Sequence, residues 1–253
     1  MKKMMLCVML VFACRVSAGI PTGSLLEGVN PGADGKIDVL TIFPHPDDEV
    51  AYSGGTLLKL KQDPRVRVHI LCMTLGELSP AKDHLGISPG KMAEIRAEEL
   101  KSAAAVLGAD EVIQWDYHDQ GLPKADQKEL YQRLLDAVHQ TDAELIIGYG
   151  PEGITGHPDH ITGYERTLQA FQNSGAQNLY YVNVPKVLYP IYRYYSRQNP
   201  LPATLKVDIR CCKKMKLLAL DEHASQKFFI GPMERLEFSV VFNYEYFTLA
   251  GQK

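Results

Sequence analysis

The sequence predicts an α/β fold: a Rossmann-like, doubly wound and mostly parallel sheet in the order 3-2-1-4-5, with helices on both faces and a short β-rich C-terminal extension. Short apolar runs alternate with longer segments of helical period, which is typical of α/β proteins. The apolar runs are nearly continuous, as expected of parallel strands buried on both faces. A chain of 253 residues that is 45% hydrophobic is long enough to form such a core without stabilising disulfides or structural metal ions.

Each expected strand is a short run rich in aliphatic side chains, followed within two residues by glycine, proline or a polar cluster. The first of these runs reads IDVLTIF. The five strands of the sheet are expected at residues 37–43, 65–74, 111–117, 143–149 and 179–184. Shorter pieces of the C-terminal extension are expected at residues 207–209, 238–242 and 246–249.

The helices are predicted from apolar positions that recur every three or four residues. Tyr131, Leu134, Leu135 and Val138 form one such stripe, and Gly108 is a stop signal after another. Helices are expected at residues 48–61, 91–107, 125–140, 160–172 and 211–226, and a long loop at residues 76–90.

The N-terminus has the pattern of a secretory signal peptide. Lys2 and Lys3 precede an apolar stretch, and small residues end it at Ala18. We therefore expect residues 1–18 to be a signal peptide, 19–36 a linker and 37–253 a single domain, in a secreted or periplasmic protein. A lipoprotein is an alternative, because the residues up to Cys14 loosely match a lipid-attachment box. A buried first helix is another.

Charge and hydropathy exclude several classes of partner. Residues 1–18 carry three basic residues and no acid, so removing them takes the net charge from −3 to −6. An acidic protein of this kind is not expected to bind nucleic acid or anionic lipid. No apolar run reaches the about 18 residues that a membrane span requires. A nicotinamide or flavin enzyme is disfavoured, because no glycine-rich fingerprint follows the first strand. The sequence gives no sign of an oligomeric state.

Two clusters of polar residues follow the first and fourth strands, which flank the point where the strand order reverses. PHPDDE begins at Pro44 and GHPDH at Gly156. Ligands of doubly wound folds bind at this edge of the sheet. His45 and Asp48, three residues apart at a helix start, can face one ion, and His160 can complete a two-histidine, one-carboxylate zinc site. The alternative is that the aspartates are ordinary helix caps.

The two clusters resemble the motifs of the LmbE-like, or PIG-L, zinc-dependent de-N-acetylases, and the resemblance extends over about residues 37–230. It implies one zinc ion per chain, with His45, Asp48 and His160 as ligands. Asp47 matches the general base of the family. His157 matches the histidine that stabilises the oxyanion and donates a proton, and Asp159 the carboxylate that keeps this histidine charged.

The same resemblance implies substrate contacts by Arg96, in an Arg-x-x-Glu element, and by Asp119, in an Asp-x-Gly-like loop. His223 begins a late His-x-Ser-Gln element of unclear role, and Glu77 follows the second strand at the functional edge. Each has a simpler interpretation: an ion pair within a helix for Arg96, a turn for Asp119, a mobile loop for Glu77 and a core hydrogen bond for His223. Some members have a tyrosine where this chain has Thr155.

We therefore expect a zinc-dependent hydrolase that removes the N-acetyl group from an N-acetylglucosamine-containing sugar or glycoconjugate. Zinc would activate a water molecule and polarise the acetyl carbonyl, and Asp47 would accept the proton of the water. One alternative is a zinc amidohydrolase that acts on a non-sugar amide. The other is a secreted glycan-binding protein without catalysis, against which the intact Asp47 and His157 argue.

Overall fold

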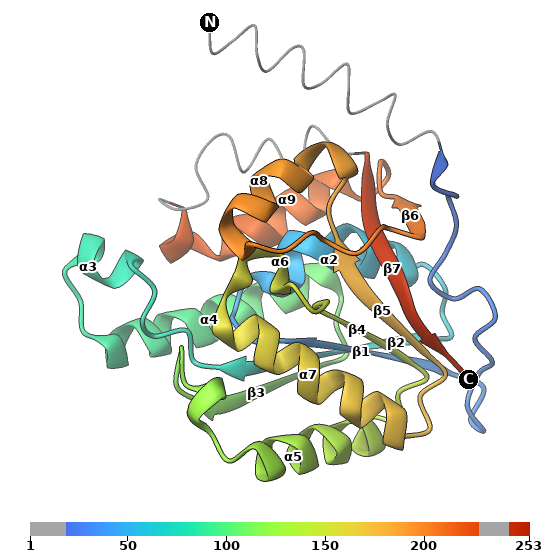
Figure 1. Ribbon diagram of the computed structural model, residues 1–253, viewed down its shortest axis with the longest axis horizontal. Coiled ribbons are helices and arrows are strands. Elements are labelled where there is room, and N and C mark those ends of the chain that lie inside the picture. The colour runs from blue at the N-terminus through green and yellow to red at the C-terminus, as the bar shows by residue number, and fades with distance from the viewer. Residues whose placement is uncertain (1–18, 228–242) are drawn as a thin grey trace, which may run out of the picture.

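The computed structural model describes residues 19–227 and 243–253, in which a central sheet lies between two layers of helices (Figure 1). Its seven strands follow the order β3-β2-β1-β4-β5-β7-β6. The first five strands in this order are parallel, and β7 and β6 are antiparallel additions at one edge. The strands are β1 (Ile37–Phe43), β2 (Val66–Thr74), β3 (Glu111–Tyr117), β4 (Leu145–Gly148), β5 (Asn178–Asn183), β6 (Leu205–Asp208) and β7 (Tyr244–Gln252).

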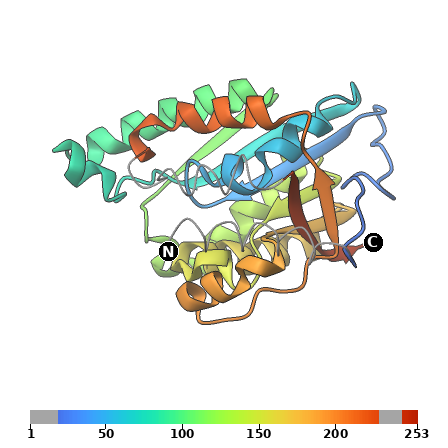
Figure 2. The same ribbon diagram turned by 90° about the horizontal axis from the view of Figure 1, so that it is seen from above.

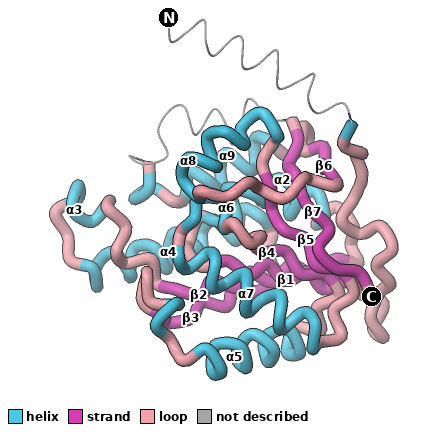
Figure 3. Tube along the Cα trace, in the orientation of Figure 1, coloured by secondary structure: helices cyan, strands magenta, loops and turns pink. Residues whose placement is uncertain are grey.

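The helices form one layer on each face of the sheet (Figure 2). One layer contains α2, α4 and α9, which pack on one another, and the other contains the neighbours α5 and α7. The helices are α2 (Asp48–Leu60), α3 (Ala81–Leu85), α4 (Pro89–Leu107), α5 (Gln127–Gln140), α6 (Gly153–Gly156), α7 (Pro158–Asn173), α8 (Tyr189–Ser196) and α9 (Lys213–Glu222). Figure 3 shows how loops at the same edge of the sheet lead into α2, α4 and α7.

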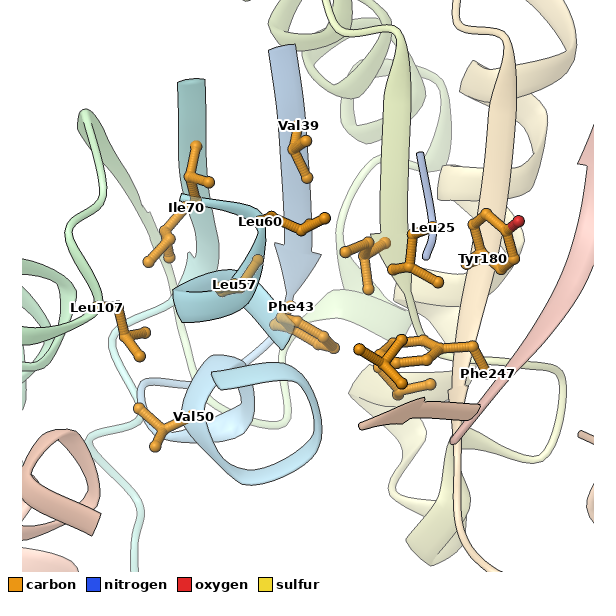
Figure 4. Packing of buried hydrophobic residues seen from close by; sticks show 14 of the residues in the cluster. Leu25, Val39, Phe43, Val50, Leu57, Leu60, Ile70, Leu107, Tyr180 and Phe247 are labelled. Atoms are coloured by element: carbon orange, nitrogen blue, oxygen red, sulfur yellow. The ribbon is translucent and has the colours of Figure 1, made fainter. Parts of the chain in front are cut away.

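The core is divided by the sheet into two clusters of buried side chains. Val39 and Phe43 of β1 face the cluster under α2 and α4, whereas Leu40 and Ile42 face the cluster under α5 and α7. Figure 4 shows the first cluster, in which Phe43 lies among side chains from α2, β2 and the C-terminal strands. Because every residue of β1 is buried, its C-terminal end is fixed from both sides.

The predicted order of the five parallel strands is confirmed. The C-terminal extension continues the same sheet, because β7 pairs with β5 and β6 pairs with β7. The expected strand at residues 238–242 and the expected signal peptide at residues 1–18 lie outside the described residues.

The helices depart from the expectation in several places. α5 begins two residues later and α7 two residues earlier than expected, and α6 was not predicted. The helix expected at 211–226 ends at Glu222, and a 3₁₀ turn follows at Ala224–Gln226. The expected loop at 76–90 contains the short α3, and α8 was not predicted. α4 begins at Pro89, two residues early, because Ser88 caps it and proline suits the first helical position.

The segment expected as a linker, residues 19–36, packs on the domain. Leu25 is fully buried in the first cluster (Figure 4), and Thr22 bridges to Lys206 of β6. In the part of the chain that the structure describes, no helix is both long and apolar enough to cross a membrane.

Candidate active site

Loops that follow β1, β2, β3 and β4 meet at one edge of the sheet, as predicted for the point where the strand order reverses. β1 pairs with both β2 and β4, so the loop after β1 lies between the other two. The structure brings His45 and Asp48, from the loop after β1 and the start of α2, together with His160 from α7. The predicted site residues from the two sequence clusters are therefore neighbours in space.

Three donor atoms converge at the floor of this site. His45 Nδ1 lies 3.1 Å from His160 Nε2 and 3.5 Å from Asp48 Oδ2, and the distance from His160 Nε2 to Asp48 Oδ2 is 3.6 Å. Ligands at about 2.1 Å from a tetrahedral zinc ion are about 3.4 Å apart. The spacing of the three atoms therefore fits one metal ion with a free position.

Both histidines are oriented by hydrogen bonds that point the correct ring nitrogen toward this centre. His160 Nδ1 lies 2.9 Å from the Gly153 carbonyl oxygen, so Nδ1 carries the hydrogen and Nε2 is the free lone pair. His45 Nε2 lies 3.2 Å from Asp159 Oδ2 and 3.3 Å from Asp119 Oδ1, so Nδ1 is free. Metal-binding histidines are usually held in this way by a carbonyl or a carboxylate.

The charges around the three atoms suit a cation. His45 and His160 are 8% and 5% exposed, and burial lowers the pKa of His160 to about 4, so that its ring is neutral. Burial opposes a charge on His45, but its contacts with Asp119, Asp159 and Asp48 outweigh burial and raise its pKa well above the ordinary value. Three carboxylates around one imidazole leave a negative site, which a divalent cation would neutralise.

Asp47 lies beside these donors and remains partly open to solvent, with 25% of its side chain exposed. Burial raises the pKa of Asp47 to about 6; Arg96 opposes this rise and Asp48 adds to it. Arg96 Nη2 lies 2.9 Å from Asp47 Oδ2 and fixes the direction of the carboxylate. A carboxylate with such a pKa is suited to accept a proton near neutral pH.

Arg96 was expected to contact substrate, but the structure places it beneath Asp47. It is 3% exposed and also donates to the backbone carbonyl oxygens of Gly76 and Pro46. Gly76 has a φ of +61°, and a Cβ there would lie 2.3 Å from Arg96 Nη1, so only glycine fits beside the guanidinium. The contacts of Arg96 thus serve Asp47 and the loop after β2.

His157 also borders the centre: it is half-buried, its ring is edge-on to His45 at 4.6 Å between centroids, and one of its ring nitrogens lies within 4.8 Å of donor nitrogens of His45 and His160. It caps α7: its Nδ1 accepts a hydrogen bond from the Asp159 backbone N–H at 3.2 Å. The hydrogen of the neutral ring is therefore on Nε2. Burial lowers the pKa of His157, while Asp159 acts in the opposite direction.

Asp159, the expected partner of His157, also makes contacts elsewhere in the site. Besides His45, the carboxylate accepts hydrogen bonds from the backbone N–H groups of Gln120 and Leu122, at 2.6 and 3.1 Å. Asp159 therefore fixes the loop after β3 and the ring of His45. Burial and the charge of His45 together lower the pKa of His157 by more than the nearby carboxylates raise it.

Glu77 and Asp119, two of the expected substrate contacts, are linked to each other. Glu77 Oε2 accepts a hydrogen bond from the Asp119 backbone N–H at 3.1 Å, and Glu77 Oε1 lies 2.9 Å from His118 Nδ1. Asp119 in turn faces His45. Asp119 also lines a groove of about 650 Å³ over the start of α5, with Leu78, Gln120, Lys124 and Arg133 among its other lining residues.

His223 is not in the open part of the site. It is fully buried, and its Nε2 lies 2.8 Å from Glu49 Oε1. Glu49 belongs to the first sequence cluster, but no role was predicted for it. The structure therefore favours the core interpretation of His223, with a carboxylate beside Asp47 as its partner.

Sequence reasoning missed Tyr149. Its hydroxyl donates to Asp48 Oδ1 at 2.5 Å, and its ring stacks on His160 with centroids 4.1 Å apart. Tyr149 directly follows β4, at the edge where the two clusters were expected to meet. That position in the sheet was the only signal for it.

Comparisons with known proteins agree with this geometry. The family model of PIG-L, described as GlcNAc-PI de-N-acetylase, matches residues 40–171, which is more than half of the chain. The chain belongs to the PIG-L family. The PIG-L match contains both clusters and all three converging donors, and it ends before His223. A relative in Bacillus anthracis, named as a probable N-acetyl-alpha-D-glucosaminyl L-malate deacetylase, is 30% identical over 74% of this chain and 80% of its own length.

Solved structures share the PIG-L fold. The N,N'-diacetylchitobiose deacetylase of Pyrococcus horikoshii has a TM-score of 0.65 at 22% identity, covering 89% of this chain and 88% of that protein. The 4-carboxy-2-hydroxymuconate hydratase of Pseudomonas putida has a TM-score of 0.63 at 16% identity, covering 86% and 97%. One fold therefore serves hydrolysis and hydration, so the activity has to be argued from the site.

Proposed function

We propose that this chain is a zinc-dependent hydrolase that removes the acetyl group from an N-acetylglucosamine-containing sugar or glycoconjugate. The observation that carries the proposal is that Asp47, held by Arg96, and His157 both border the three converging donor atoms. The naming of the Bacillus anthracis relative as a deacetylase of a glucosaminyl malate supports the substrate class.

His45, Asp48 and His160 would hold the metal ion, because their free donor atoms are the ones that converge. Bound there, zinc would supply Lewis-acid activation of the attacking water and of the acetyl carbonyl. Asp48 ionises readily in this position: burial opposes ionisation, but His160 and His45 lower its pKa below the ordinary value. The second oxygen of Asp48 is occupied by Tyr149, which leaves Oδ2 for the metal.

Asp47 acts as the general base. Its carboxylate, held by Arg96, accepts a proton as water adds to the amide carbon. His157 faces the site with an N–H at Nε2 and donates a hydrogen bond to the oxyanion of the tetrahedral intermediate. The C–N bond then breaks and the amine leaves with a proton, which Asp47 returns from the attacking water; His157 is the alternative donor only in its protonated form.

The groove beside Asp119 would hold the part of the substrate beyond the acetylated sugar. Its volume of about 650 Å³ lies in the range of ligand pockets, which is about 300–1,000 Å³. Lys124 and Arg133 on its wall are outnumbered by four acidic residues: Asp116, Asp119, Asp126 and Glu129. The groove therefore favours a neutral, hydroxyl-rich or zwitterionic partner over a strongly anionic one.

Acetate release from a panel of amides tests the proposal. The zinc-loaded protein is incubated with N-acetylglucosamine, diacetylchitobiose and N-acetylglucosaminyl conjugates, and in parallel with N-acetylated amino acids. We expect acetate only from the sugars. Release of acetate from the N-acetylated amino acids alone would mean that the substrate is a non-sugar amide. Zinc binding without release of acetate from any compound would favour a non-catalytic glycan-binding protein.

Export to the periplasm or the medium is part of the proposal, and it depends on residues 1–18. The charged start, the apolar middle and the small residues up to Ala18 support it. An exported enzyme meets glycans and glycoconjugates outside the cytoplasm, which agrees with the substrate class proposed here.

A further inference from the structure

Asp47 has a backbone conformation that needs support. Its φ of 110° lies in the region that favours glycine, although it carries a side chain. Residues with such backbone angles persist where the surrounding structure fixes them, and they gather at functional sites. The question is which groups hold Asp47 in this conformation.

The backbone N–H of Asp47 donates to Glu49 Oε2 at 2.9 Å. The other oxygen of the same carboxylate lies 2.8 Å from His223 Nε2. Glu49 is 1% exposed and His223 is fully buried, so water does not compete for either bond. Glu49 thus bridges the backbone of Asp47 to a histidine that is 174 residues away in the sequence.

The rest of the His-x-Ser-Gln element contacts the other supports of Asp47. The backbone N–H and hydroxyl of Ser225 donate to Glu99 at 2.6 and 2.7 Å. Glu99 lies three residues after Arg96 on α4, and Arg96 holds the Asp47 carboxylate. Gln226 accepts a hydrogen bond from Ser79, in the loop after β2, at 2.8 Å. α9 packs along α2 and α4 and brings the element to this place (Figure 2).

We propose that Glu49 and His223 are positioning residues, which hold Asp47 in the conformation required of the general base. The inference rests on the proposed function, in which Asp47 is the base. It gives a role to the one sequence element that lies outside the family match, because His-x-Ser-Gln then fixes the base through Glu49 and through α4.

The closing experiment measures kcat, KM, zinc content and thermal unfolding for His223→Ala, His223→Gln and Glu49→Gln. A small displacement of a catalytic group costs up to about 100-fold. We therefore expect kcat of His223→Ala to fall about 10–100-fold, with KM within about 2-fold and zinc retained. His223→Gln should recover part of the loss, because its amide N–H can donate to Glu49. If His223→Ala does not fold, Glu49→Gln replaces it, since glutamine keeps the size and one acceptor.

A double-mutant cycle separates positioning from a general structural effect. If His223 acts through Asp47, His223→Ala should cause no further loss of kcat in an Asp47→Asn background. The matched control is His69→Ala, which breaks another histidine–carboxylate pair, in which His69 Nε2 of β2 lies 2.7 Å from Asp38 Oδ1 near the N-terminal end of β1. It should leave kcat unchanged.

Two outcomes would overturn the inference. In the first, His223→Ala lowers kcat by the same factor in the Asp47→Asn background as in wild type. In the second, the loss of kcat is accounted for by lost zinc or by unfolding of the variant. A crystal structure of the His223→Ala or Glu49→Gln protein gives a readout that does not need activity. We expect Asp47 to leave its φ of about 110° in that structure. An inactive wild type would count against the proposed function only, whereas an unmoved Asp47 in the variant would count against the positioning role.

Discussion

Tyr149 donates a hydrogen bond of 2.5 Å to Asp48 Oδ1, the oxygen that does not face the three-atom centre. The tyrosine lies just after β4 and the aspartate begins α2, so this bond joins the two sides of the site. Because it occupies one oxygen, it fixes the rotation of the carboxylate and directs Oδ2 toward the centre. Such outer contacts usually affect metal binding almost as strongly as the ligands themselves.

Tyr149→Phe is therefore expected to weaken zinc binding about 10–100-fold while the stacking on His160 and the fold are kept. Competition with a chromophoric chelator measures the affinity. Tyr180→Phe removes a hydroxyl from a buried tyrosine of β5 and is the control, with unchanged affinity expected. Equal affinities for Tyr149→Phe and wild type would remove Tyr149 from the site.

Asp47→Asn is expected to lower kcat about 10²–10⁴-fold with little change in KM, because asparagine keeps the size and loses the base. Zinc content should stay the same, since the carboxylate is not among the three converging atoms. Steady-state kinetics of acetate release together with metal analysis test this. Turnover close to that of wild type would contradict the mechanism even with the metal site intact.

His157→Ala is expected to lower kcat about 10²–10³-fold, as for the loss of one oxyanion donor. His157→Gln distinguishes a neutral donor from a charged one, because glutamine can donate an N–H but carries no charge. We expect it to retain more kcat than His157→Ala. Equal losses in the two variants would instead support the charged histidine implied by the family resemblance.

The sheet order and the convergence of His45, Asp48 and His160 could be predicted from the sequence, because both depend on local patterns. Buried parallel strands have apolar runs, and residues that follow such strands share one edge of the sheet. The short α3 and α6 were missed because neither has room for a repeating apolar stripe.

The supporting contacts could not be predicted in the same way. The bond between Glu49 and His223 spans 174 residues, so no spacing indicates it. Asp47, Gln120 and Ile154, one in each of the segments that follow β1, β3 and β4, have positive φ angles without being glycine. Tertiary contacts fix these conformations, and local propensity alone argues against them.

Export makes a prediction about the N-terminus. The exported protein should begin at or near Gly19, because the small residue Ala18 suits signal-peptide cleavage. Mass spectrometry of the protein from the periplasm or the medium tests this, and Ala18→Tyr should leave the precursor uncut. A cytoplasmic protein that keeps Met1, with no exported fraction, would contradict the secretory interpretation.

The pair of His223 and Glu49 also predicts how stability depends on pH. Burial by itself would lower the pKa of His223, but the Glu49 carboxylate outweighs burial and raises it above the ordinary value of 6.5. Below pH 6.5, His223 is charged in both the folded and the unfolded chain, and its stabilising contribution is complete. As the pH rises through the folded pKa, the folded chain loses the proton that the unfolded chain has already lost, and the contribution disappears.

The free energy of unfolding of wild type should therefore exceed that of His223→Gln by more at pH 5.5 than at pH 8.5. Urea unfolding of the metal-free proteins at the two pH values measures this difference. Ionisable groups that titrate alike in wild type and His223→Gln do not contribute to it. In a Glu49→Gln background the pH dependence should reverse, with a smaller difference at pH 5.5 than at pH 8.5, because the charge that raises the pKa of His223 is gone and burial lowers it. With Glu49 in place, a difference that grows toward pH 8.5 would mean that His223 is neutral in the fold, and that the contact with Glu49 is an uncharged hydrogen bond.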